Sequence, residues 1–156
     1  MHSLVLLAWL LACALQDLRE RQVANLLTLG ACTLALGYLL WSGHTWLGAP
    51  AVEGGWAFAL SLAFTLPGYA LGRLGAGDVK LLAALGLATS IDYLLGTFIG
   101  AGLSSLLWFL LAPKLWPYIA QRLKAHLHQI APNTSKKHPF VPFLFVGFFA
   151  TWLCFH

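Results

Sequence analysis

Charged residues are scarce in this chain. Its 156 residues include nine Lys or Arg and five Asp or Glu, so that 9% are charged, whereas an ordinary soluble domain has about 25%. Hydrophobic residues make up 60% of the sequence. So little charge excludes an ordinary soluble domain and offers no extended basic surface for nucleic acid. The composition therefore predicts a membrane protein with no nucleic-acid partner.

Long stretches of the chain lack Asp, Glu, Lys and Arg altogether. A helix needs about 20 apolar residues to cross the hydrocarbon core of a bilayer. Six such stretches occur: 1–16, 22–52, 54–72, 81–91, 93–113 and 138–156. We predict one crossing in each, with a turn-rich loop at 41–55. The expected fold is an all-α membrane protein of six transmembrane helices, with residues 1–156 as a single domain.

One side of this predicted topology has no basic residue. The other side receives the loops around 17–22, 73–80 and 113–138, which hold all nine Lys and Arg residues: Arg19, Arg21, Arg73, Lys80, Lys114, Arg122, Lys124, Lys136 and Lys137. Cytoplasmic loops carry an excess of Lys and Arg. We therefore expect the basic side to be cytoplasmic and both termini to lie outside.

The sequence also lacks the spacing of a disulfide framework or a metal site. Cys13, Cys32 and Cys154 fall in apolar stretches with no CxxC pair, so we expect buried, inert thiols. His126 and His128 have no evident third ligand and are interpreted as surface histidines. We expect neither a metal nor a cofactor.

Two of the five acidic residues stand at the inner ends of predicted spans. Asp17 ends the first span and Asp78 opens the fourth, and both spans are short for a full crossing, which should draw the flanking acids inward. Two carboxyls at one depth could share a proton and activate water, as in an aspartic protease. Taken singly, Asp78 could instead be a helix N-cap, and Asp17 a solvated residue of a charged turn.

Three sequence motifs resemble those of one family. "GAGD" (75–78), followed by "VK", resembles the GxGD signature of intramembrane aspartyl proteases in the GxGDxK form of type IV prepilin peptidases. "DLRERQVANLL" (17–27) resembles the first motif of that family, and "HPFVPFLFVG" (138–147) resembles its Pro-Phe-Gly-Pro-Phe-Leu element. Ala24 and Val141 replace the usual proline and glycine, departures that affect neither acid.

The resemblance implies an aspartic endopeptidase of the bacterial cytoplasmic membrane with Asp17 and Asp78 as catalytic residues. Its substrates would be prepilins or pseudopilins, which lose a basic leader at the cytoplasmic face, and its partners the pilus or secretion assembly machinery. The chain has no room for the four-cysteine insert of the full-length peptidases. It looks like the short, peptidase-only form of tight-adherence (Flp-type) systems, so N-methyltransferase activity is not expected.

Supporting residues are expected around the two acids. Gly75 and Gly77 should let the backbone approach an extended substrate and adopt conformations closed to other residues. Lys80 could bias the acid electrostatically or meet lipid phosphates.

The turn after the first acid offers three further candidates. Arg19, Arg21 and Asn25 could orient the Asp17 turn, although a topology signal explains the two arginines almost as well.

The segment 113–139 carries an apolar stripe at helical spacing. The stripe consists of Trp116, Ile119, Leu123, Leu127 and Ile130. With the intervening basic residues, this pattern predicts an amphipathic helix on the inner leaflet, attracted by anionic lipid head groups.

Two other functions remain open from the sequence. The acids could form a proton relay in a small transporter or channel subunit, or the chain could be an inactive scaffold in a pilus assembly. A serine intramembrane protease is disfavoured, because "GLSSL" (102–106) lacks a glycine after the serine and no histidine lies in a middle helix.

Overall fold

The computed structural model describes residues 2–20, 22–115 and 140–155, and every regular element among them is a helix. The helices are α1 (His2–Glu20), α2 (Asn25–Ser42), α3 (Ala51–Ala70), α4 (Ala76–Ala88), α5 (Ile91–Leu115) and α7 (Val141–Phe155). The predicted all-α class is therefore confirmed for the described residues. The amphipathic helix predicted within 113–139 lies almost wholly outside them, as do Arg21, His126 and His128.

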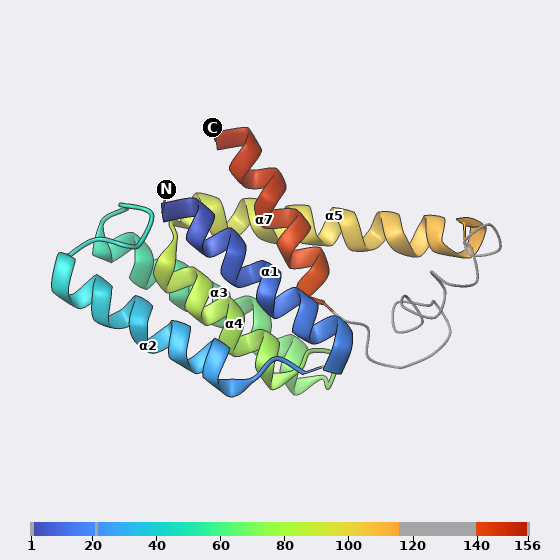
Figure 1. Cartoon of the computed structure of the whole chain (residues 1–156), viewed down its shortest axis with the longest axis horizontal. Coiled ribbons are helices and arrows are strands. Elements are labelled where there is room, and N and C mark those ends of the chain that lie inside the picture. Colours follow the sequence, from blue (N-terminus) through green and yellow to red (C-terminus); the bar gives the residue numbers. More distant parts are fainter. Residues whose placement is uncertain (1, 21, 116–139, 156) are drawn as a thin grey trace.

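Helix α4 lies at the centre of the bundle. It packs against α2 and α3, while α7 packs against α5 and α1 (Figure 1). Every residue from Leu81 to Ala88 is buried. A helix that is apolar on all sides is expected in the interior, which accounts for the short apolar run predicted after Asp78.

The core joins helices from both halves of the chain. Its fully buried members include Leu10 of α1, Leu81 and Leu85 of α4, and Phe148 of α7. Close packing against α3 depends on Gly86, because a Cβ there would lie 2.8 Å from the carbonyl oxygen of Ala57. The contacts of α4 with α2 and α3 position it in the bundle.

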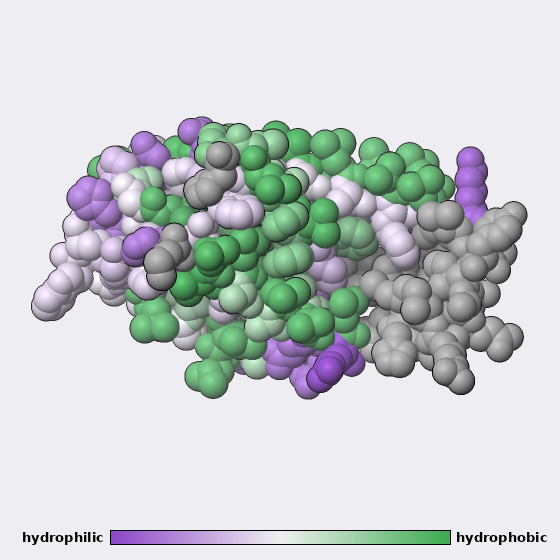
Figure 2. Space-filling model, turned by 45° about the horizontal axis from the view of Figure 1, so that its top comes forward, coloured by the Kyte–Doolittle hydropathy of each residue, from purple (hydrophilic) through white to green (hydrophobic). Residues whose placement is uncertain are grey.

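Among the residues that the structure describes, three helices are long and apolar enough to cross a membrane: α1, α2 and α5 over Ile91–Leu111. Helix α7 is apolar but shorter. Large apolar side chains face outward, among them Leu26 and Trp41, which are 85% and 94% exposed, and apolar residues cover much of the face in Figure 2. These features support a membrane protein. The six crossings and the placement of the termini stay predictions.

The bundle has two distinct ends (Figure 1). At the site end, α1 and α3 finish and α2, α4 and α7 begin, while α5 runs on past them; at the loop end lie residues 43–50 and both chain termini. The described basic residues lie at or beside the site end: Arg19, Arg73, Lys80 and Lys114. Glu53 and Asp92 occupy the first turns of α3 and α5, at the loop end.

Candidate active site

Asp17 lies in the last turns of α1 with its side chain turned inward. It is 5% exposed and continues the buried face formed by Cys13 and Ala14. Its Oδ2 accepts a hydrogen bond from the backbone N–H of Val141, the first residue of α7, at 3.3 Å. Because a carboxylate is stabilised near the N-terminus of a helix, the start of α7 is a favourable environment for this acid. The expectation of a solvated turn residue is therefore wrong.

Asp78 lies inside the first turn of α4. Gly75 is the N-cap of this helix, and its N–H donates to Oδ2 of Asp78 at 3.1 Å. Asp78 is therefore the third helical residue, and the interpretation of Asp78 as the N-cap itself is wrong. Its side chain is half-buried. The carboxyl thus caps the start of α4 and remains partly accessible at the site end.

The two acids lie near one another. Asp17 and Asp78 come from different helices, yet they are close enough for their charges to interact. Each also receives a backbone N–H from a helix start, Asp17 from α7 and Asp78 from α4. The site end thus holds two neighbouring carboxyls, one buried and one half-buried, beside the beginnings of two helices.

Gln16 holds the turn that follows Asp17. Its Oε1 accepts the N–H of Ala24 at 3.0 Å, which ties the start of α2 back to α1. A second link comes from Trp9, whose Nε1 donates to the carbonyl oxygen of Leu27 at 3.1 Å. Sequence reasoning missed Gln16, and only its place beside Asp17 could have drawn attention to it.

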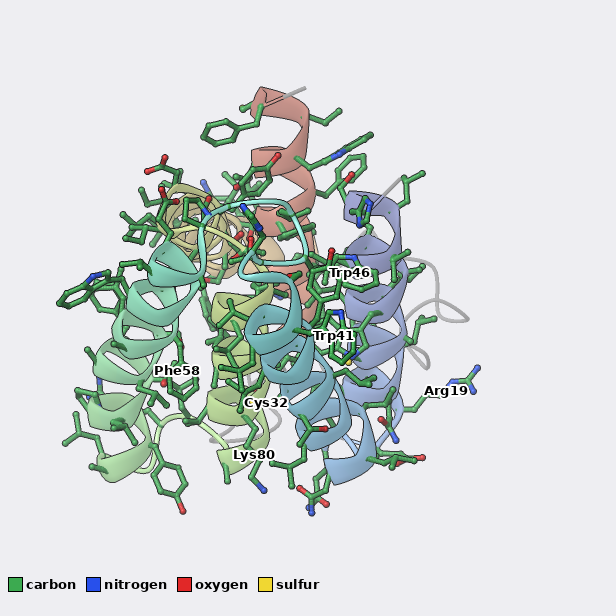
Figure 3. The ribbon with its side chains drawn as sticks, turned by 90° about the vertical axis from the view of Figure 1, so that its left-hand side faces the viewer. Arg19, Cys32, Trp41, Trp46, Phe58 and Lys80 are labelled. Atoms are coloured by element: carbon green, nitrogen blue, oxygen red, sulfur yellow. The ribbon has the colours of Figure 1, made fainter. Side chains whose placement is uncertain are left out.

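Lys80 connects α4 to α2. Its Nζ donates to Oδ1 of Asn25 at 3.0 Å, and Figure 3 places it near the site end of α4. The structure thus joins two predicted supporting residues in a contact that the sequence did not indicate.

Arg19 is exposed and extends from α1 away from the other helices (Figure 3). Nothing in this orientation supports the prediction that Arg19 orients Asp17.

The glycines before Asp78 matter for the space that they leave, and not for an unusual backbone conformation. Gly75 has φ −79°, and the glycine with positive φ in this region is Gly72, at 68°. The expectation that Gly75 and Gly77 adopt conformations closed to other residues is therefore wrong, since neither has a positive φ. A Cβ on Gly75 would lie 3.3 Å from Oδ2 of Asp78, and one on Gly77 would lie 3.9 Å from the backbone of Val23. Gly75 leaves room for the carboxyl.

No cluster of three or more His, Cys, Asp or Glu that could hold a metal occurs among the described residues. Cys13 is buried and Cys32 half-buried, but Cys154 is exposed. Because the last turn of α7 presents Cys154 to the surroundings, the expectation of a buried thiol at this position is wrong.

Fold and site together indicate a helical membrane protein with two neighbouring carboxyls at one end of its bundle. A family model matches residues 4–110, a stretch that contains both acids, and the chain belongs to the type IV leader peptidase family. Searches of curated proteins and of solved structures each found no significant match. The family establishes a peptidase and implies a prepilin substrate. Helix α7 lies beyond the matched stretch.

Proposed function

We propose that the chain is an aspartic endopeptidase in which Asp17 and Asp78 together activate water. The observation that carries this proposal is the approach of the two carboxyls at the site end, with both acids inside the stretch that matches the leader peptidase family. Two neighbouring carboxyls whose charges repel in a partly dehydrated site favour a state with one proton between them. Such a pair supplies a general base and a general acid at the same time.

The reaction follows from that shared proton. The ionised carboxyl accepts a proton from water while the water oxygen attacks the peptide carbonyl carbon, and the protonated carboxyl donates its proton to the carbonyl oxygen. In the second half the carbonyl re-forms as one hydroxyl of the tetrahedral intermediate returns its proton to the pair, the C–N bond breaks, and the pair delivers one proton to the leaving amine nitrogen. The pair ends with the single proton with which it began.

The substrate we infer is a prepilin or pseudopilin with a basic leader. Such a leader stays on the cytoplasmic side because of its charge, and the described Lys and Arg residues gather at the same end of the bundle as Asp17 and Asp78. A helical peptide has its carbonyls engaged in i→i−4 hydrogen bonds. The scissile segment must therefore be extended where it reaches the two acids.

Several finer features belong to this proposal. The chain would be a single six-span domain of the bacterial cytoplasmic membrane, with both termini outside. Anionic lipid head groups and the pilus or secretion machinery would be its partners. It would correspond to the peptidase-only form of Flp-type systems, without N-methyltransferase activity. The proton-relay alternative is not favoured, because the family is one of peptidases.

Asn substitution at each acid tests the proposal. We expect Asp17→Asn and Asp78→Asn each to reduce leader removal from a purified prepilin by about 10³-fold or more, since each removes half of the acid–base pair. The matched control is Asp92→Asn, an acid in the first turn of α5 at the loop end, which should retain activity within about twofold, as surface changes usually do. Appreciable cleavage by either site variant would refute the two-carboxyl mechanism.

A further inference from the structure

The N-terminus of α7 brings a backbone donor to Asp17. Val141 and Asp17 are remote in the chain, yet the Val141 N–H donates to Oδ2 of the carboxyl at 3.3 Å. Val141 is 0% exposed and Asp17 5% exposed. Water therefore competes little for this hydrogen bond, and a hydrogen bond to an ionised group is stronger than one between neutral groups.

The sequence of α7 leaves Val141 as the donor of the first turn. A helix start exposes several N–H groups without partners inside the helix. Pro142 has no N–H, and the N–H groups of Phe143 and Leu144 both bond to the carbonyl oxygen of Phe140 at 3.1 Å. The N–H of Val141 is thus the one that the start of this helix directs at the acid.

Helix α7 is itself held firmly. Gly100 of α5 and Gly147 of α7 let the two backbones touch, since a Cβ on Gly100 would lie 2.7 Å from the Cα of Gly147. Ser104 Oγ donates to the carbonyl oxygen of Phe143 at 3.4 Å. Packing at this density leaves little room for α7 to shift along α5. The Val141 N–H is therefore a fixed reference point for the carboxyl.

We propose that Val141 is a positioning residue, whose backbone N–H fixes the Asp17 carboxyl for the reaction. By engaging Oδ2 it restricts the rotation of the carboxyl and leaves Oδ1 for the proton transfer of the proposed reaction. This inference rests on the proposed aspartic peptidase function and gives α7, which lies beyond the family match, a part in it. Because the donor is a backbone N–H, the contact does not require the glycine that is usual at this position of the family's element.

The variant Val141→Pro removes the N–H and exchanges the buried valine side chain for the proline ring. Proline is favoured at the first position of a helix, where its φ fits, so α7 should still form. We expect kcat for leader removal to fall by about tenfold to a hundredfold, the cost of misplacing a catalytic group by about 1 Å. KM and the thermal midpoint in detergent should stay close to those of the parent enzyme. The matched control Val141→Ala keeps the N–H and loses side-chain volume, and should retain most of kcat.

Two results would overturn the inference. Val141→Pro with more than half of the parental kcat would show that the N–H is dispensable, and an equal loss in Val141→Ala would assign the effect to side-chain packing. If Val141→Pro does not fold, an ester bond introduced with the α-hydroxy analogue of valine at 141 removes the same N–H and must show the same loss of kcat. If Asp17→Asn and Asp78→Asn are inactive while Val141→Pro is active, this inference fails and the proposed function stands.

Discussion

The two ends of the bundle use their polar groups differently. At the loop end, backbone groups bond to one another: Thr45 N–H to Ala49 at 2.7 Å, and Leu47 N–H to Ala88 at 3.2 Å. Trp46 adds a hydrogen bond from Nε1 to the carbonyl oxygen of His2 at 3.1 Å and an edge-on contact with Tyr38. At the site end, by contrast, backbone donors terminate on carboxyl oxygens of Asp17 and Asp78.

The difference in polar groups indicates which end of the bundle is suited to catalysis. At the loop end the hydrogen bonds described above join neutral backbone and indole groups. At the site end the carboxyls meet two helix starts, where the positive end of the helix dipole favours negative charge, and they also repel each other. An arrangement with both features can hold one negative charge and one proton, which the loop end cannot do.

The strongest test of this comparison is Asp78→Glu, which separates capping from catalysis. Glu at the third helical position also reaches the N-cap N–H, so α4 should start as before and the thermal midpoint should hold. The added methylene moves the carboxyl by about 1 Å, which can cost about 10²-fold in rate. We expect leader removal to fall by about that factor in a prepilin cleavage assay.

The matched change at the loop end is Asp92→Glu, also in the first turn of a helix. It should leave both cleavage and the thermal midpoint unchanged. Full activity in Asp78→Glu would mean that the position of this carboxyl does not matter, and the site end would then resemble the loop end.

A second prediction concerns the loop end, where a substitution should lower stability and leave activity unchanged. Trp46→Phe keeps an aromatic ring against Tyr38 and loses the hydrogen bond to His2. We expect a loss of about 1 kcal/mol in the free energy of unfolding, measured by denaturation in detergent, with unchanged leader cleavage. Trp41→Phe is the control, because Trp41 is 94% exposed. Loss of activity in Trp46→Phe would show that the two ends are coupled.

The sequence predicted the part of this site that depends on residue type and membrane depth. Asp17 and Asp78 could be paired because Asp17 ends one apolar run and Asp78 opens another on the same predicted side. The backbone donors could not be predicted, because every residue except proline carries an N–H and the sequence does not mark which one contacts the acid. Val141 lies beside Asp17 only because α7 packs against α1. The contact of Lys80 with Asn25 was missed for a similar reason, since it depends on how α2 lies against α4.

The smallest effect is expected for Lys80→Met, and it decides how far the chemistry of the site end extends. The Lys80 ammonium reaches Asn25 of α2, and a residue two positions from Asp78 does not face it along the helix. Removal of a partly exposed contact of this kind costs about 1 kcal/mol or less. Cleavage should fall by no more than about threefold, equivalent to under 1 kcal/mol of transition-state energy.

Asn25→Ala is the control for this variant and should show the same loss of cleavage. The double variant should show no additional loss, because both changes remove the same contact. A fall of more than tenfold in Lys80→Met alone, with Asn25→Ala active, would instead assign the lysine charge to the two acids.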